Sequence, residues 1–303
     1  MNTTHPYEPR VQAVVSALAD ALDRGGELPD LGELAARAHF SPFHFHRLWR
    51  ALTGETVGAT VLRLRLLRAV DLLADESRAV TDIALAVGFG SSQAFARVVR
   101  EQLDTTPTAL READAREEAR ARIESRRPRA TAAPCQVEVV SLSPFRALLQ
   151  RAVGGEDAVA LAYGALFEYA ASAGLLERID GLWGIDWDDR RDVDEAECRA
   201  DCLVAIGGDA FSPSGESASG DVSLARLDGG RYARVRVVGS FRGIEPAIDA
   251  VLAAWLPGSG EALREAPVLL NYLDDPETTP EAALRTDVHV PLAMAYAQWT
   301  RVD

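Results

Sequence analysis

The sequence contains no lysine, only three cysteines, and no apolar run long enough to cross a membrane. All 32 basic residues are therefore arginine, which reflects genome composition more than function. Cys135, Cys198 and Cys202 are too few for a disulfide framework and lack the spacing of a metal site. Residues 1–30 carry no signal-peptide pattern. These absences predict a cytoplasmic protein with no membrane partner.

The net charge of −14 is unevenly distributed along the 303 residues. Residues 1–129 contain 18 arginines and 18 acidic residues, so residues 130–303 carry the whole negative excess. Within residues 31–111 the balance is slightly positive, with 10 arginines and 8 acidic residues. A nearly neutral domain can still bind DNA when its arginines gather on one face. DNA binding is therefore expected in the N-terminal half.

One sequence pattern occurs twice in that half, with matches too dense for chance. The stretch Leu34–Arg50 aligns with Ile83–Arg100 at an offset of 49, which becomes 50 after one inserted residue. Each copy has a short apolar helix, a turn, and a second helix that a serine opens. This layout predicts two helix-turn-helix motifs.

Local signals support the two motifs. Ser41 and Ser91 are the predicted N-caps of the second helices, and Pro42 suits a first helical position. Gly88 can adopt the positive φ of a tight turn. The large apolar side chains of each second helix share one face. The opposite, exposed face is predicted to carry His44, His46 and Arg47 in the first copy and Ser92, Gln93 and Arg97 in the second.

Helical periodicity over residues 7–24 predicts a first helix, and periodicity over residues 56–74 predicts a long helix that joins the motifs. Residues 111–129 are rich in Ala, Arg and Glu and predict a solvated helical linker, although Arg126–Arg129 could instead contact phosphates. The second half changes period. Strands are predicted at 137–140, 202–206, 222–227, 232–238, 268–273 and 287–290, and helices at 157–173 and 244–256. This β-α-β-β-β-α-β-β order predicts an α+β domain around an antiparallel sheet, which could be a tandem of two similar halves.

The N-terminal half resembles an AraC-type DNA-binding domain over about a quarter of the chain. The resemblance rests on Ser41, Arg47-Leu48-Trp49, Ile83-Ala84, Gly88-Phe89, Phe95, Arg97, and Pro107 with Arg111. Asp104 and Val99 depart from the family pattern, and both departures are expected to affect packing only. The resemblance implies an all-α domain whose two recognition helices enter successive major grooves. The expected DNA contacts are Ser41, Phe43, His44, His46, Arg47, Arg50, Ser91, Ser92, Gln93 and Arg97, with base and phosphate contact both open for the arginines.

The second half resembles a GyrI-like effector-binding domain over residues 135–293. The resemblance rests on Val137-Glu138-Val139, Gly239, Phe241, Ala254-Trp255-Leu256, the segment Tyr272–Pro276, Leu284–Asp287 and Val290-Pro291-Leu292. It implies an aromatic-lined cleft between two halves of the sheet, which accepts small, often cationic and apolar molecules. The expected effector-binding residues are Tyr163, Trp183, Asp186, Trp187, Phe241, Leu270 and Tyr272. For each aromatic residue a plain core position remains the alternative.

One departure from this second family affects the expected ligand. Many members have a buried glutamate two residues before the tyrosine that matches Tyr272, and here that residue is Leu270. We therefore expect a neutral or differently charged effector, unless Asp186 or Glu168 supplies the carboxylate. The missing carboxylate also weakens the case for hydrolysis, which needs a general acid or base. No nucleotide-binding glycine loop, nucleophile elbow or metal constellation is recognisable, so neither a cofactor nor an enzyme activity is expected.

Together these observations predict a bacterial, DNA-binding transcription regulator that senses a small molecule. The predicted domains are a DNA-binding domain at residues 1–112, a linker at 113–134 and an effector-binding domain at 135–303. The predicted partners are double-stranded DNA and an apolar or aromatic small molecule, with RNA polymerase as a further candidate. Two alternatives remain: a protein that sequesters small molecules, or a hydrolase of reactive small molecules that acts through the C-terminal cleft.

Overall fold

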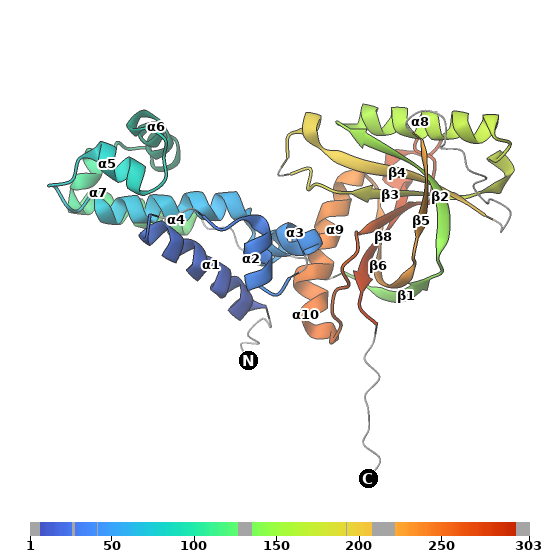
Figure 1. The fold of residues 1–303 in the computed structure, drawn as a ribbon, viewed down its shortest axis with the longest axis horizontal. Helices are drawn as coiled ribbons and strands as arrows, with labels where there is room; N and C mark the ends of the chain where they lie inside the picture. The colour runs from blue at the N-terminus through green and yellow to red at the C-terminus, as the bar shows by residue number, and fades with distance from the viewer. Residues whose placement is uncertain are drawn as a thin grey trace, which may run out of the picture. The chain divides into compact units, whose positions relative to one another are not determined.

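The computed structural model describes residues 7–25, 28–40, 42–126, 135–191, 193–207 and 222–294 (Figure 1). The chain separates into two compact units, residues 1–131 and 132–303, and each is described by itself. Ser41, the linker residues 127–134 and the loop at 212–220 lie outside the described residues. Among the helices in the described ranges, none combines the length and the apolar character needed to cross a bilayer.

The first unit is all-α, as predicted. Its helices are α1 (Glu8–Asp23), α2 (Leu31–Arg37), α3 (Pro42–Thr53), α4 (Val57–Leu72), α5 (Val80–Ala86), α6 (Ser92–Leu103), the short η1 (Ala109–Arg111) and α7 (Ala113–Ser125). Helices α2 and α3 form the first helix-turn-helix motif, and α5 and α6 form the second. Helix α4 is the long helix that joins them (Figure 1).

Side-chain caps fix where three of these helices begin. Asp30 accepts a hydrogen bond from the backbone N–H of Glu33 at 2.8 Å, and the Glu33 side chain accepts one from the backbone of Asp30 at 3.2 Å. Thr56 and Ser91 each accept a hydrogen bond from the N–H three residues later, at 2.9 Å and 3.1 Å. The predicted cap at Ser91 is therefore confirmed, and Pro42 begins α3 as predicted. These caps satisfy N–H groups that a helix start leaves without partners.

Left-handed backbone conformations recur at equivalent positions of the two motifs. Gly88 has the predicted positive φ, 84°, and His39, 49 residues earlier, has a φ of 52°. Asp104 has a φ of 55°, and Gly54, 50 residues earlier, has a φ of 78°. A side chain at such a position costs energy that glycine avoids. The expectation that Asp104 affects packing only is therefore wrong, because the departure concerns the backbone.

Helix α7 belongs to the packed core of the first unit. Ala119 and Ile123, one helical turn apart, are buried in one apolar cluster with residues of α4, α5 and α6. Arg122 donates a hydrogen bond to the carbonyl of Leu103 at the end of α6. Residues 113–125 are helical as predicted, but they pack on the first unit and do not form a solvated linker. Only two of the 13 residues in α7 are buried, so the charged majority hid the apolar stripe.

The second unit is an α+β domain on one eight-stranded antiparallel sheet, which confirms the predicted fold class. Its strands are β1 (Glu138–Leu142), β2 (Phe145–Val153), β3 (Ile179–Asp186), β4 (Arg199–Ile206), β5 (Ser223–Leu227), β6 (Gly230–Val238), β7 (Leu269–Tyr272) and β8 (Arg285–Leu292). Its helices are α8 (Glu156–Ser172), α9 (Ile244–Asp249), the π-helical η5 (Ala250–Trp255) and α10 (Leu256–Ser259). Short 3₁₀ turns are η2 (Leu176–Arg178), η3 (Glu195–Glu197), η4 (Phe241–Gly243) and η6 (Glu281–Ala283).

This sheet is a tandem of two similar halves. The order β1-β2-α8-β3-β4 is followed by β5-β6-α9-β7-β8. In space the strands lie in the order β1-β6-β8-β7-β3-β4-β2-β5, and exchanging the two halves reads the same order in reverse. Strands β3 and β7 pair at the centre. The unit therefore has a pseudo-twofold axis between β3 and β7.

Two strands, β2 and β3, were missing from the predicted β-α-β-β-β-α-β-β order, which is corrected to two ββαββ halves. The neighbouring residues Ala147 and Leu148 of β2 are both buried, so the alternation that marks a one-sided strand is lost. Strand β3 contains Gly181 and Gly184, and glycine disfavours strand predictions. Glycine is needed at 184, because a Cβ there would lie 2.9 Å from the hydroxyl oxygen of Tyr272.

Candidate functional site

The outer face of α6 carries predicted DNA contacts of the second motif. Gln93 is exposed, and one turn later the Arg97 side chain is 75% exposed. Arg97 lies 3.8 Å from Glu101, a surface ion pair of the kind that contributes little stability. On the inner face Phe95 is buried against Phe89, with ring centroids 5.2 Å apart. Helix α6 is therefore anchored on one side and offers an amide and a guanidinium on the other.

A third residue extends this row. Arg100 is exposed and follows Gln93 and Arg97 at the i, i+4, i+7 spacing of one helix face. Arg100 was not among the predicted contacts, although its match with Arg50 in the repeat was a signal for it. Ser92 is half-buried at the start of the helix, with its hydroxyl 3.4 Å from the Gln93 side chain. The described face thus holds two arginines and one amide.

Helix α3 differs from α6 in how much of it is exposed. Nothing is described for the side chains of three predicted contacts, Ser41, Phe43 and His44. His46 and Arg50 are half-buried. Arg47 is 4% exposed, so the prediction that it lies on an exposed face is wrong. Because Phe45, Leu48 and Trp49 are buried as well, helical spacing alone overestimates the exposed face of residues 45–53, the part of α3 whose burial is described.

In the second unit, strand pairing sorts the predicted effector residues by face. Leu270 lies directly opposite Gly184, and Tyr272 lies opposite Leu182. Gly184 is paired in turn with Cys202, which packs against α8. Because directly paired residues share a face, Leu270 and Tyr272 lie on the side of the sheet that α8 covers. We call this side the helix face.

Three aromatic side chains meet on the helix face. The ring of Tyr272 makes edge-on contacts with Tyr163 of α8 and Phe241 of η4, at centroid distances of 6.2 and 5.6 Å. The Tyr163 hydroxyl donates a hydrogen bond to the carbonyl of Trp183 at 2.6 Å. All three rings are half-buried. This aromatic cluster, Tyr163, Phe241 and Tyr272, joins elements from both halves of the unit.

A carboxylate lies on the same face of the sheet as the aromatic cluster. Asp186 follows Gly184 by two residues on β3 and therefore shares the helix face. Burial raises the pKa of Tyr163 and of Tyr272 well above the usual value, and the negative charge of Asp186 contributes in both cases. Burial also raises the pKa of Cys202 to about 12, with Asp186 as the largest charge effect. Asp186 has a side chain 13% exposed and lies 3.7 Å from Arg190.

The two tryptophans lie on the other face of the sheet. Trp183 packs against Phe145 and His289, with ring centroids 5.0 and 5.4 Å away. The indole N–H of Trp187 donates to Asp201 at 2.7 Å. The prediction that Trp183 and Trp187 line one cleft together with Tyr272 is therefore wrong. The reason is strand alternation, because residues 183 and 187 point away from the side of residues 184 and 186.

Ion pairs repeat between the two halves at an offset of 86 residues. They are Asp188–Arg199 and Asp274–Arg285, and Arg151–Asp201 and Arg236–Asp287, all with closest N–O distances of 2.7 Å. Arg151 and Arg236 depart from this offset by one residue, since they are 85 residues apart. The central pair Gly184 and Leu270 is separated by the same offset and therefore lies on the pseudo-twofold axis. By the same relation, Asp186 is the counterpart of Tyr272. A carboxylate and a phenol thus flank the centre of the helix face. Across the described residues, no group of three or more His, Cys, Asp or Glu side chains is arranged to hold a metal ion.

Comparison with known families gives a match in each half of the chain. The family described as a GyrI-like small molecule binding domain matches residues 135–293, more than half of the chain. The family described as a helix-turn-helix domain matches residues 34–113, which run from α2 to the start of α7. The two matches cover the stretches that resemble a GyrI-like domain and an AraC-type DNA-binding domain in sequence.

Two bacterial regulators are similar to this chain in sequence. The probable transcriptional regulator YgiV of Escherichia coli strain K12 is 39% identical over 111 residues, which cover 37% of this chain and 66% of YgiV. The regulatory protein SoxS of Salmonella typhimurium strain LT2 is 31% identical over 101 residues, which cover 33% of this chain and 94% of SoxS. The chain thus spans slightly less than two thirds of YgiV and nearly the whole of SoxS.

Among solved structures, a hydrolase from Listeria innocua has a TM-score of 0.42 and 17% identity, covering 53% of this chain and 94% of the hydrolase. At this level of similarity no activity is transferred. The sequence matches are the stronger finding, because they cover both units and include relatives named as regulators. The chain belongs to the AraC-type transcriptional regulators and carries a GyrI-like small molecule binding domain in its C-terminal half.

Proposed function

We propose that this protein regulates transcription by placing α3 and α6, the two reading helices, into successive major grooves of one DNA duplex. The observation that carries the proposal is the outer face of α6, where Gln93 and Arg97 are exposed at one-turn spacing. Arginine is the commonest bidentate reader of guanine, and glutamine can pair with adenine. The proposed contacts are Ser41, Phe43, His44, His46, Arg47, Arg50, Ser91, Ser92, Gln93 and Arg97, to which we add Arg100.

The two reading helices make unequal contributions in this proposal. Helix α6 offers three exposed polar side chains, whereas Arg47 of α3 is buried and would have to change conformation to meet a base. With equal numbers of arginines and acidic residues in residues 1–129, non-specific attraction to phosphates is weak. Affinity should therefore depend on base contacts and fall steeply for altered sites. We place the DNA-binding domain from α1 through α7, since α7 packs with α4 and α6.

We also propose that the effector binds on the helix face, at the aromatic cluster of Tyr163, Phe241 and Tyr272. Their half-buried rings supply flat apolar contact area for an apolar or aromatic molecule. Many members of the GyrI-like family have a buried glutamate two residues before this tyrosine, and here that residue is Leu270, which is buried on the same face as Tyr272. Asp186 supplies a carboxylate on the same face, and its charge reaches the tyrosines of the cluster. The preferred effector is therefore an aromatic molecule with one positive charge.

A pair of probes tests the role of Asp186. Tetraphenylphosphonium carries a positive charge among four phenyl rings, and triphenylphosphine oxide is a neutral molecule in which an oxygen replaces one of those rings. Titration calorimetry should show tighter binding of the cation, and Asp186→Asn should weaken that binding about tenfold while leaving the neutral probe unchanged. Equal loss of both probes in the variant would show that Asp186 maintains the fold of the site and is not the counter-ion.

Coupling between the two units is the remaining part of the proposal. A ligand can change DNA affinity only if it binds one state of the protein more tightly than another. RNA polymerase is a further proposed partner, because regulators act at promoters that polymerase also occupies. A non-enzymatic role agrees with the relatives named as regulators. A turnover screen in which the protein consumed a small molecule would instead support the hydrolase alternative.

Selection of genomic DNA fragments by the purified protein tests the DNA-binding proposal. At moderate salt, retained fragments should share a site with two boxes about one helical turn apart. A box is the short stretch of base pairs that one reading helix contacts. Genes beside that site would indicate the chemical class of the effector. Absence of any enriched site would contradict the proposed function and would favour sequestration of small molecules.

A further inference from the structure

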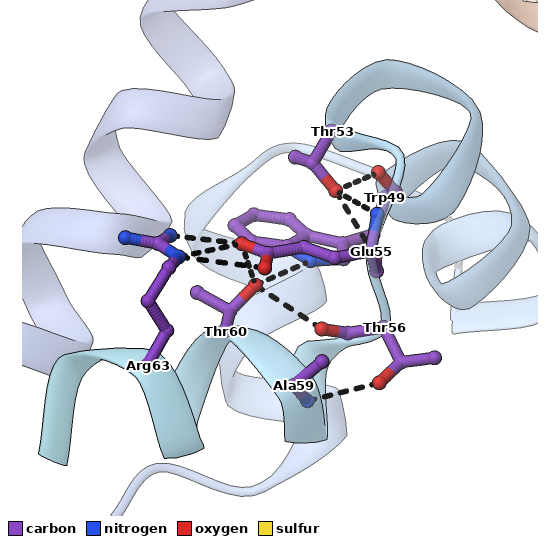
Figure 2. A network of polar contacts seen from close by, with 7 residues as sticks. All are labelled: Trp49, Thr53, Glu55, Thr56, Ala59, Thr60 and Arg63. Carbon is purple, nitrogen blue, oxygen red and sulfur yellow. Dashed lines mark hydrogen bonds and ion pairs between the residues drawn. The ribbon is translucent and has the colours of Figure 1, made fainter. Parts of the chain in front are cut away.

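The joint between α3 and α4 contains a buried polar network (Figure 2). Glu55 lies in the three-residue connection between the helices and is 7% exposed. Its carboxylate accepts hydrogen bonds from the guanidinium of Arg63 and from the hydroxyl of Thr60, both at 2.8 Å and both from α4. The Thr60 hydroxyl oxygen accepts a hydrogen bond from the indole N–H of Trp49 in α3 at 3.2 Å. These four residues, the joint network, connect the first reading helix to the joining helix.

The physical character of the joint network favours a role in geometry over a role in stability. A buried ion pair adds little net stability, because the cost of removing both charges from water offsets their attraction. Hydrogen bonds, however, require narrow distances and angles, whereas apolar side chains tolerate repacking. Trp49 and Thr60 are fully buried, so the hydrogen bond between their side chains is shielded from bulk water. The angle between α3 and α4 is therefore held more tightly than apolar packing alone would hold it.

The second motif has no such network at the equivalent joint. At an offset of 50 residues, the counterparts of Trp49, Glu55 and Thr60 are Val99, Thr105 and Leu110. Val99 and Leu110 are buried apolar residues. One hydrogen bond is common to both joints, since Thr56 and Thr106 each accept a hydrogen bond from the N–H three residues later. The network thus occurs at the joint that leads into α4, and α4 leads on to the second motif.

We propose that Glu55, Thr60 and Arg63 are positioning residues that set the angle of α3 on α4, and thereby the spacing of DNA boxes that both reading helices can bind together. The inference rests on the proposed function, because it requires simultaneous binding of two boxes. Helix α4 carries α3 through this network at one end and continues to α5 and α6 at the other. A change in the α3 angle therefore displaces one reading helix relative to the other.

A double substitution separates positioning from stability. Glu55→Leu with Arg63→Met removes one charge of each sign and replaces the pair by apolar side chains, which buried ion pairs often tolerate without loss of stability. The matched control is Asp23→Leu with Arg68→Met, because this pair also involves α4, has a distance of 3.0 Å and is solvent-exposed. Each protein is measured on the two-box site from genomic selection and on versions with one or two base pairs inserted or deleted between the boxes.

Each inserted base pair rotates and displaces one box, so a rigid pair of reading helices should lose about tenfold or more in affinity. The wild type and the control should show this loss. The affinity of the Glu55/Arg63 double variant should fall by less than about threefold between the original spacing and the altered spacings. Its thermal unfolding midpoint should be close to that of the wild type. If the double variant fails to fold, Thr60→Val, which replaces the hydroxyl by a methyl group of similar size, should broaden the spacing preference in the same direction.

Retention of the wild-type spacing preference by the folded variants would overturn the positioning role. A lower unfolding midpoint together with an unchanged spacing preference would show that the network is structural only. Absence of two-box binding by the wild type would contradict the proposed function itself, which distinguishes the two failures.

Discussion

Arg97 and Glu101 offer a test in which one ion pair is broken from either side. Their side chains are 75% and 58% exposed and 3.8 Å apart. A surface pair with this geometry contributes less than about 0.5 kcal/mol. Arg97→Ala and Glu101→Ala should therefore leave the free energy of unfolding nearly unchanged. Any effect on DNA binding then comes from the contact with DNA and not from a loss of structure.

Only one of the two variants should weaken DNA binding. Arg97→Ala removes a charge-assisted contact, which is worth about 1–3 kcal/mol for a good base contact, or roughly 5- to 150-fold in Kd. Glu101→Ala keeps Arg97 and removes a negative charge near the phosphates, so affinity should stay equal or rise. The loss of the ion pair itself is common to both and cannot explain a difference between them.

Fluorescence anisotropy on a labelled duplex that contains the selected site measures both affinities at several salt concentrations. If Arg97 contacts a phosphate, the slope of log K against log salt should decrease by about one in Arg97→Ala. If Arg97 reads a base, the variant should instead lose discrimination at one base pair. Equal weakening by Arg97→Ala and Glu101→Ala would refute the reasoning, as would an unchanged affinity in Arg97→Ala.

The remaining predictions concern stability. Asp104→Gly should stabilise the first unit by about 0.5–1 kcal/mol, because Asp104 has a φ of 55°. Gly54→Ala should destabilise the same unit by about 1 kcal/mol, because Gly54 has a φ of 78°. Urea unfolding midpoints that move in the same direction in both variants would contradict this. Burial lowers the pKa of His289, so the unfolded state takes up the proton first as the pH falls. The stability of the second unit should therefore decrease below about pH 6.5, and His289→Gln should lack this part of the pH dependence. Gly184→Ala should cost about 1–3 kcal/mol, because the added methyl lies 2.9 Å from the hydroxyl oxygen of Tyr272; an unchanged thermal midpoint would count against that contact.

Features set by a few neighbouring residues were predictable from the sequence. The cap at Ser91, the start of α3 at Pro42 and the positive φ of Gly88 all depend on local chemistry, and the structure has each of them. The repeat within residues 34–100 added long-range information, because two copies of one pattern require one fold.

Features set by tertiary packing were not predictable in the same way. At the centre of β2 the neighbouring residues Ala147 and Leu148 are both buried, so the alternation is lost there. The preference for glycine at 184 in β3 comes from the side chain of Tyr272, which is 88 residues away in the sequence. Arg47 occupies the polar side of its helix by spacing and is nevertheless buried. The spacing of Trp183 and Trp187 favours a place in the cleft, whereas the face that each occupies depends on a strand register that no sequence pattern indicates.

Dimethyl sulfate interference on the selected DNA site tests the central claim most directly, since methylation of guanine N7 blocks contacts in the major groove. Two reading helices of one protein predict two tracts of interfering guanines, about one helical turn apart on the same face of the duplex. Arg97→Ala should remove interference in one tract and leave the other. A single tract in the wild-type complex would contradict simultaneous reading by α3 and α6.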